Sequence, residues 1–477
     1  MPRLQALSFL RTSAAASGGL LGALLLLLTS SVARAQSPAA GSDDILIRGG
    51  TVLTITDGVK ENTDVLVRDG TIAAIGRGLD APRGVEVYDA TDMYVMPGIV
   101  DAHSHIAISS VNEATNPVTA EVSVGDVLDP FEIEIYRALA GGVTVSHVMH
   151  GSANPIGGQN ETIKHRYGET DPDALRMEGA PRTIKFALGE NPTRVHGQGR
   201  DIQPTSRMGV EQVIRGALKE AQRYAEAKRA YEAGERAAPP PHSERLEVLA
   251  GILSGDVLVH CHSYRADEIL MLLDVMRDFG VDNVVFQHVN EGFKVAPELA
   301  AFGAGASVFS DWWAYKFEVY YSTAYNAAIL TRNGVLTSIN SDSAELNRHL
   351  YHEAAKSQKY GGLTDEEALR LITLDPARQL GIADRVGSIE VGKDADLAIF
   401  NAHPLSIYAV VERTIVDGVT RFDRTLDPDD MRLRVDPEMP VEVATHWTGD
   451  RDDRCMQGAF LHASERGLSL ERTAHTH

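Results

Sequence analysis

The pattern of apolar and polar positions predicts a central region of alternating strands and helices. Between residues 96 and 385, short runs rich in valine and isoleucine alternate with longer segments of helical spacing. This alternation is typical of parallel strands joined by helices. Eight candidate strands end, in chain order, at His105, at His147, near Ile163, and at Leu188, His262, His288, Asp311 and Asp342. Eight such units predict an α/β fold, a (β/α)8 barrel of the TIM type.

Segments 44–95 and 386–425, on either side of this barrel, show shorter alternating runs separated by turn residues. Arg68-Asp-Gly70 lies between two apolar runs and is typical of a β-hairpin turn. β-rich segments on both sides of one barrel predict a small composite β-sandwich formed from both ends of the chain. Two unrelated hairpins are the alternative.

A long departure from the barrel pattern separates the fourth and fifth candidate strands. Residues 209–237 combine helical apolar spacing with many charges, and the proline-rich residues 238–241 end the pattern. They predict either a helical excursion near the barrel mouth or a solvated surface helix. Residues 426–477 form a C-terminal tail rich in Asp, Arg and His, which we expect to be extended or partly disordered.

The first 35 residues have the layout of a secretory signal peptide. Arg3 and Arg11 precede an apolar stretch, and Ala33-Arg-Ala35 is a small-x-small cleavage site. Cleavage near Ala35 predicts an exported protein, periplasmic or secreted; an uncleaved membrane anchor is the alternative. Removal of three arginines and no acidic residue changes the formal net charge from −21 to −24. So acidic a chain is a poor partner for nucleic acid, and we expect no stable membrane insertion.

Composition limits how such a chain is stabilised. With 43% apolar residues it can bury a sizeable core, and its two cysteines are Cys261 and Cys455. Two cysteines exclude a disulfide framework, although one bridge between them stays open. Stability is therefore expected to come from packing and from bound metal.

Residues suited to metal binding stand at the carboxyl ends of the candidate strands. In a strand, His103 and His105 point to the same side, so both imidazoles can reach one ion. The full set of candidates is His103, His105, Lys185, His260, His288 and Asp342. A single buried histidine is more often bonded to a carbonyl group, but a barrel gathers all these strand ends on one rim. The donors predict a divalent metal, most of all zinc, with one or two ions per chain.

Several motifs together resemble the amidohydrolase superfamily, and within it the imidazolonepropionase-like branch that includes metal-dependent prolidases. They are Pro97-Gly-Ile-Val-Asp-Ala-His-Ser-His105, the strand-end histidines His260 and His288, Ser341-Asp-Ser343, Leu374-Asp-Pro-Ala-Arg-Gln-Leu-Gly381 and Gly387-Ser-Ile-Glu-Val-Gly-Lys-Asp-Ala-Asp-Leu397. The resemblance covers about residues 44–425. It implies a barrel with a composite β-sandwich, a mononuclear or binuclear metal centre, and water-mediated hydrolysis of amide-type bonds.

The resemblance also implies a role for each matching ligand. His103 and His105 would hold the more buried metal, and His260 and His288 the second. Asp342 would bind metal, accept a proton from the attacking water as general base, and pass that proton to the leaving nitrogen.

A bridging ligand between the two ions is less sharply defined. In binuclear relatives a carboxylated lysine on the fourth strand spans both ions, and Lys185 matches that position. Glu190 is a ready-made carboxylate a few residues further on and is the alternative bridge. A Lys185 paired with an acid, together with a single metal, also stays open.

Two further residues are candidates for contact with substrate. His262 lies on the same strand face as His260, and the resemblance leaves it for substrate contact or for support of the ligands. Arg194 follows a flexible polar segment near the expected mouth and could hold a substrate carboxylate, although an ordinary surface arginine fits as well.

These observations predict an exported metal-dependent amidohydrolase that cleaves an amide, peptide-like or cyclic amide bond. Its expected partner is a small-molecule or short-peptide substrate, and a homo-oligomer is compatible with the sequence. One alternative is a deaminase of a nitrogen heterocycle, but such relatives place a glutamate just after the fifth-strand histidine, where this chain has Cys261. The other is a metal-containing binding protein without turnover.

Overall fold

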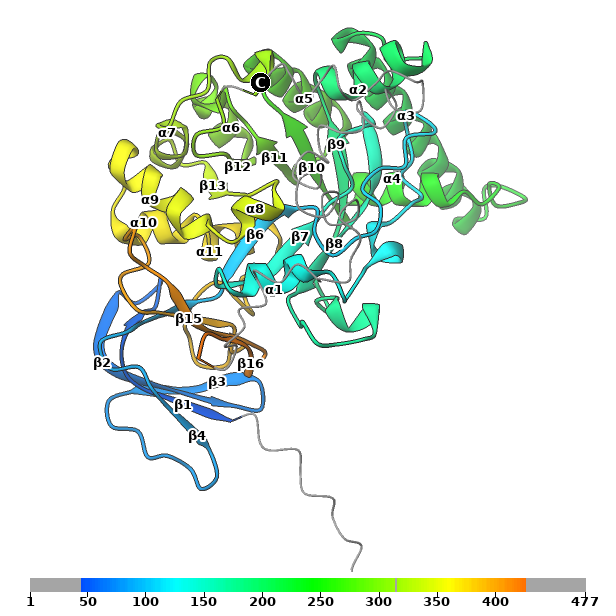
Figure 1. Cartoon of the computed structure of the whole chain (residues 1–477). Coiled ribbons are helices and arrows are strands. Elements are labelled where there is room, and N and C mark those ends of the chain that lie inside the picture. The colour runs from blue at the N-terminus through cyan, green and yellow to red at the C-terminus, as the bar shows by residue number, and fades with distance from the viewer. Residues whose placement is uncertain (1–43, 314, 426–477) are drawn as a thin grey trace, which may run out of the picture. The chain divides into compact units, whose positions relative to one another are not determined.

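The computed structural model describes residues 44–313 and 315–425, which belong to one compact unit (Figure 1). The predicted signal peptide, the C-terminal tail and Cys455 lie outside the described residues. None of the helices in the described ranges is long and apolar enough to cross a membrane.

An eight-stranded barrel sheet forms the centre of the described chain, which confirms the predicted fold class. Its strands are neighbours in sequence order from the first to the last. They are β6 (Ile99–Ser104), β7 (Val143–Val148), β8 (Ile156–Lys164), β9 (Arg182–Ala187), β10 (Val257–Ser263), β11 (Val284–His288), β12 (Gly305–Val308) and β13 (Leu336–Ile339). The barrel strands therefore lie where the apolar runs place them.

One strand differs from the expected pattern of parallel neighbours. β8 pairs antiparallel with both β7 and β9, whereas the other neighbouring pairs in the barrel are parallel. Only residues 149–155 connect β7 to β8, which is too short for the crossover that a parallel neighbour needs. The prediction that the strand near Ile163 is parallel is therefore wrong.

The barrel is nearly closed where its first and last strands meet. The backbone amide of Asp342, just after β13, donates to the carbonyl of His103 on β6 at 3.0 Å. Ser341 donates from its amide and its hydroxyl to the carboxylate of Asp101 on β6, at 3.1 and 2.6 Å. These bonds fix the two strand ends that carry candidate ligands relative to each other.

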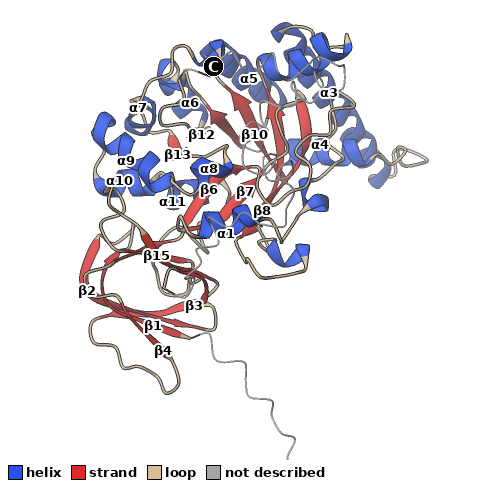
Figure 2. Cartoon of the chain, viewed as in Figure 1, coloured by secondary structure: helices blue, strands red, loops and turns tan. Residues whose placement is uncertain are grey.

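Helices surround the barrel strands, as Figure 2 shows. They are α1 (Ile133–Leu139), α2 (Glu190–Thr193), α3 (Arg207–Glu232), α4 (Glu244–Ser254), α5 (Ala266–Phe279), α6 (Ala296–Phe302), α7 (Asn326–Arg332), α8 (Ala344–Asn347), α9 (Leu350–Gly361), α10 (Asp365–Arg370) and α11 (Leu374–Gln379). Short 3₁₀ turns are η1 (Val124–Val127), η2 (Pro172–Leu175), η4 (Gly292–Lys294) and η5 (Phe317–Val319), and η3 (Arg194–Gln198) is a π-helix.

The helical departure between the fourth and fifth barrel strands is α3 followed by α4. The hydroxyl of Ser206 caps α3 by accepting from the amide of Gly209. A stripe that includes Val210, Ile214 and Leu218 is buried, and α3 packs on α4 and α5. The apolar spacing thus marks a face that is covered by neighbouring helices, so α3 is not solvated all round.

The second sheet combines strands from both ends of the described chain. Its order is β16-β15-β14-β5-β1-β2-β3, and β4 pairs with β1. The strands are β1 (Ile45–Leu53), β2 (Val59–Arg68), β3 (Thr71–Gly76), β4 (Glu86–Asp89), β5 (Tyr94–Pro97), β14 (Leu397–Phe400), β15 (Val411–Val416) and β16 (Val419–Asp423). We call it the composite sheet; the antiparallel pairing of β14 with β5 joins its two halves.

Two hairpins of the composite sheet turn in the same way. Asp69-Gly70 joins β2 to β3 and Asp417-Gly418 joins β15 to β16, and all four residues have positive φ. This is the conformation that two-residue hairpin loops require, and Asp-Gly adopts it at low cost. The predicted hairpin at Arg68-Asp-Gly70 is confirmed.

A buried ion cluster connects the barrel to the composite sheet. Lys164, at the end of β8, is fully buried, and its Nζ lies 2.6 Å from Asp394 and 3.2 Å from Asp396. It also contacts Asp417 in the β15–β16 turn. Asp394 also pairs with Arg385 and Asp417 with Arg166, so Lys164 is the cation that the three carboxylates share.

Candidate metal centre

The two histidines of the first barrel strand direct ring nitrogens at one point. Nδ1 of His105 donates to the carbonyl of Met149 at 2.8 Å, which turns its Nε2 toward His103 and Asp342. Nδ1 of His103 lies 3.2 Å from the side-chain oxygen of Gln287. The two Nε2 atoms are 3.2 Å apart, so the imidazoles meet as a spacing of two residues requires.

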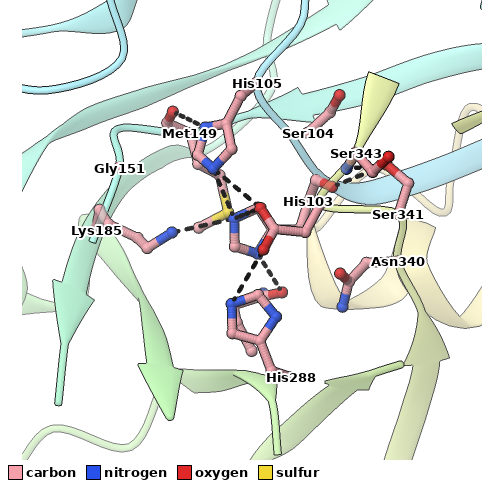
Figure 3. Close-up of polar contacts among 12 residues, drawn as sticks. His103, Ser104, His105, Met149, Gly151, Lys185, His288, Asn340, Ser341 and Ser343 are labelled. Atoms are coloured by element: carbon pink, nitrogen blue, oxygen red, sulfur yellow. Dashed lines mark hydrogen bonds and ion pairs between the residues drawn. The ribbon is translucent and has the colours of Figure 1, made fainter. Parts of the chain in front are cut away.

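Lys185 and Asp342 complete the group around these nitrogens (Figure 3). Nζ of Lys185 lies 3.1 Å from Nε2 of His103, and the lysine is fully buried. Oδ1 of Asp342 lies 3.4 Å from Nε2 of His103 and 3.2 Å from Nε2 of His105. Four donor atoms from three different strand ends therefore converge on one point.

The spacing of these atoms fits a bound divalent ion. Ligands arranged tetrahedrally at about 2.0–2.1 Å from zinc lie about 3.3–3.4 Å from one another. The separations among Nε2 of His103, Nε2 of His105 and Oδ1 of Asp342, 3.2 to 3.4 Å, are close to this value. Lys185 is left out of this comparison, because a lysine ammonium repels a cation and has no lone pair to offer it. The donor set therefore fits zinc or a similar ion.

Burial sets the protonation states that metal ligands need. Burial, helped by the nearby Lys185, holds the pKa of His103 well below its ordinary value, and burial lowers the pKa of His288 to about 3. Burial alone would raise the pKa of Asp342, but the hydrogen bond with His105 and the charges around it keep that pKa below its ordinary value. The imidazoles are thus neutral and the carboxylate charged, as metal binding requires.

His288 and His262 form a second group beside the first. Nε2 of His288 lies 3.7 Å from Oδ2 of Asp342, and the rings of His262 and His288 are 4.7 Å apart. Neither ring nitrogen of His262 has a hydrogen-bond partner among the described residues. Buried imidazoles without such partners are available as ligands for another ion.

His260 and His262, on the same face of β10, have different neighbours. Its Nδ1 accepts from the side-chain amide of Gln287 at 3.1 Å, and its ring lies 4.4 Å from that of His147. His262, rather than His260, is the residue of β10 that lies beside His288. Both are on one strand face, so the pattern alone could not decide which of them reaches His288. Their roles as ligands remain predictions.

Glu190 and Arg194 lie together on the short helix α2 and its end. Glu190 forms ion pairs with Arg194 at 3.2 Å and with Lys316 at 3.8 Å. The side chain of Arg194 is half exposed, with 51% of its surface accessible. The cluster of possible metal-binding His and acidic residues found among the described residues is His103, His288 and Asp342. Glu190 is not part of it, so Lys185 is the better placed bridging candidate.

Two of the candidate ligands have strained backbone conformations. His288 has a φ of 69° and Asp342 a φ of 46°, which non-glycine residues adopt rarely. Such conformations cost about 1–3 kcal/mol each and persist where the surroundings fix them. Here they turn both side chains back toward His103 at the point where their strands end.

Two residues that support the ligands had no role in the sequence prediction. Asp101 accepts from the amide of His103, from Ser341 twice, and from the side chain of Asn347 at 2.6 Å. Gln287 bonds to His103 on one side and to His260 on the other. Asp101 lies within the motif that ends at His105, and this motif was the sequence signal that could have identified it. Gln287 directly precedes His288, and no sequence pattern pointed to it.

We expect Asp101→Asn to weaken metal binding about 10–100-fold, because an amide cannot accept the bonds from four donors. Burial raises the pKa of Asp101 to about 6, so at pH 8 it is a charged acceptor. Metal titration at that pH measures the effect. Asp80→Asn in an exposed loop is the control, and equal affinity in both variants would contradict the role of Asp101.

A small cavity lies against the cluster on the side of His105 and Asp342. Two buried carboxylates, Glu132 and Glu134, form part of its wall. The other lining residues are Ile106, Ser343 and Ala344. This acidic lining suits a polar, hydrogen-bond-donating part of a ligand next to the candidate ligands.

A solved structure with the same architecture decides the family. An amidohydrolase from Thermotoga maritima is 35% identical to this chain; the match covers 80% of this chain and all of that one, with a TM-score of 0.74. The chain belongs to the amidohydrolase family. The model of the amidohydrolase family also matches residues 318–421.

Two curated relatives have sequences similar to that of this amidohydrolase. Amidohydrolase tasK of Hapsidospora irregularis is 33% identical over 72% of this chain, but the match spans only 38% of that protein. Imidazolonepropionase of Thermoplasma acidophilum is 27% identical, and the match covers 75% of this chain and 82% of the relative. The second match supports the imidazolonepropionase-like branch that the motifs resemble.

Proposed function

We propose that this amidohydrolase is a metal-dependent hydrolase of a carbon–nitrogen bond in an amide, peptide-like or cyclic amide substrate. The observation that carries the proposal is the convergence of His103, His105, Lys185 and Asp342, with donor atoms 3.1 to 3.4 Å apart. This set of donors suits a hydrolytic metal site, and it stands at the carboxyl ends of barrel strands, where such enzymes act.

The chain's own groups perform the proton transfers of the proposed reaction. A bound divalent ion supplies a Lewis acid that polarises a carbonyl group and makes water more acidic. Asp342 is charged, lies at the cluster and is oriented by His105, so it accepts the proton of the attacking water. It then gives this proton to the leaving nitrogen, which departs as a neutral amine.

In the proposed arrangement the chain holds up to two ions. His103 and His105 would hold the first, and His260 and His288 the second, as the resemblance implies; His262, whose ring lies beside that of His288, is a further candidate ligand. Lys185 would bridge the two if its amine were carboxylated, because carboxylation converts it to an anionic oxygen donor. Arg194 directly follows α2, and its side chain is half exposed. It is the candidate to bind a substrate carboxylate.

Export and partners belong to the same proposal. A signal peptide cleaved near Ala35 directs the enzyme to the periplasm or outside the cell. Its partners are a small molecule or short peptide, and the strongly acidic composition disfavours nucleic acid.

The test uses the purified mature chain loaded with zinc and a panel of dipeptides, N-acyl amino acids and cyclic amides. We expect hydrolysis of at least one class, loss of activity after chelation, and recovery when zinc is returned. Amine and carboxylate products are quantified together. Activity that is unchanged by complete removal of metal would contradict the proposal, as would release of ammonia from heterocycles with no amide cleaved.

Lys185→Ala should lower the metal content from about two ions per chain toward one, because the bridge to the second ion is lost. The content is measured by elemental analysis after dialysis with and without bicarbonate. Bicarbonate should raise the metal content of the wild type and should not change that of Lys185→Ala. Lys219→Ala, at an exposed position on α3, is the control. One ion per chain in both variants and in the wild type would rule out a bridging role for Lys185.

A further inference from the structure

A separate aromatic cluster lies at the carboxyl ends of the barrel strands. Tyr264 follows β10 and Phe309 follows β12, and both are buried together with Val319. Trp312 and Tyr315 pack against them and are only partly buried. This cluster is distinct from the main core of the barrel, so packing of the core does not account for it.

The cluster begins directly on a candidate metal ligand. Phe309 stacks on His288 with ring centroids 4.5 Å apart and an angle of 20° between the rings. Trp312 stacks on Phe309 at 4.4 Å and 14°, and Tyr315 meets Trp312 edge-on at 5.4 Å. A continuous series of rings thus extends from His288 to side chains that are accessible to solvent.

Polar contacts hold this segment in place. Nζ of Lys316 lies 4.0 Å from the ring centroid of Tyr264, on which His288 also stacks, and the hydroxyl of Tyr315 donates to that of Tyr264 at 2.9 Å. The amide of Asn290 donates to Ser322 at 2.6 Å. Rings fixed in this way lose little entropy when a ligand binds to them.

We propose that Trp312 and Tyr315 form a subsite for an aromatic or other planar apolar group of the substrate, next to the bond that is cleaved. The inference rests on the proposed function, because it defines which substrates that site accepts. Ligand sites are lined by aromatic side chains with a few polar groups beside them, and aromatic rings favour stacked or edge-on partners.

The test compares Trp312→Ala with Trp313→Ala. Trp313 is the next residue, is 49% exposed, and has no stacking contact in this series, so it is a matched control. On zinc-loaded enzyme, KM for N-acetylphenylalanine should rise about tenfold in Trp312→Ala, with kcat little changed. KM for N-acetylalanine should stay the same, and Trp313→Ala should change neither.

Binding of compounds that cannot be hydrolysed separates this inference from the proposed function. Calorimetry of 3-phenylpropionate and butyrate on the zinc-loaded proteins should show preference for the aromatic compound in wild type and in Trp313→Ala only. If that preference depends on Trp312 but no substrate is hydrolysed, the subsite stands and the proposed function fails. If hydrolysis occurs without any preference for aromatic groups, the function stands and the subsite is wrong.

A structural effect of the substitution is also distinguishable. Trp312→Leu keeps most of the volume but loses the stacking surface, so it should show the same selective loss if Trp312→Ala does not fold. Equal losses for the aromatic and aliphatic probes in both variants would overturn the inference.

Discussion

Asp342→Asn should lower kcat about 10²–10⁴-fold on any substrate of the wild-type enzyme, because an amide cannot accept the proton of the attacking water. Asp342 also contacts His103 and His105, so the variant is expected to bind metal more weakly. Kinetics are therefore measured at saturating zinc, with the metal content of each sample determined in parallel.

Asp311→Asn is a suitable control, because Asp311 follows the neighbouring strand β12 and pairs with Lys356 at 2.8 Å. It should retain most of its activity. Full activity of zinc-loaded Asp342→Asn would show that another group takes the proton, and the proposed mechanism would be wrong.

Lys164→Met should lower the free energy of unfolding by about 3–5 kcal/mol, because it leaves the buried Asp396 without the cation that it pairs with, while Asp394 and Asp417 keep Arg385 and Arg166. Chemical denaturation measures the loss. Lys60→Met removes the exposed pair with Asp57, in which the side chains are 36% and 78% exposed, and should cost less than about 1 kcal/mol. Equal losses in the two variants would contradict a special role for Lys164.

The loss in Lys164→Met should also depend on pH. Burial raises the pKa of Asp396 to about 6 in the folded protein, from an ordinary value of 3.8. The folded state therefore holds this proton more tightly, and the stability from this group is present below about pH 4 and lost as the pH rises through about 6. A protonated Asp396 needs no cation, so the variant should be less impaired at pH 5 than at pH 8.

The barrel and the positions of its ligands could be predicted because period and chemistry coincide at the strand ends. Apolar runs end at His105, His288 and Asp342, and parallel strands bring such ends to one rim. The direction of β8 was missed because an apolar run has the same pattern in either direction. The short connection 149–155, which excludes a parallel crossover, was the available signal.

The choice between His260 and His262 shows a second limit. Both residues lie on the same face of β10, and a hydrogen bond from Gln287 holds the first while the second lies beside His288. Such a choice depends on contacts between strands. The aromatic cluster was missed for a similar reason, because Tyr264 follows β10 whereas Phe309, Trp312 and Tyr315 follow β12.

The bond between the amide of Asp342 and the carbonyl of His103 has a consequence for how the enzyme matures. The neighbouring contact of Asp101 with Ser341 joins residues 240 positions apart, so these ends meet only when nearly the whole barrel has formed. Contacts of such sequence separation form late and slow folding. The ion is therefore expected to bind at the end of folding. The time course of metal uptake during refolding would then report when the barrel is complete.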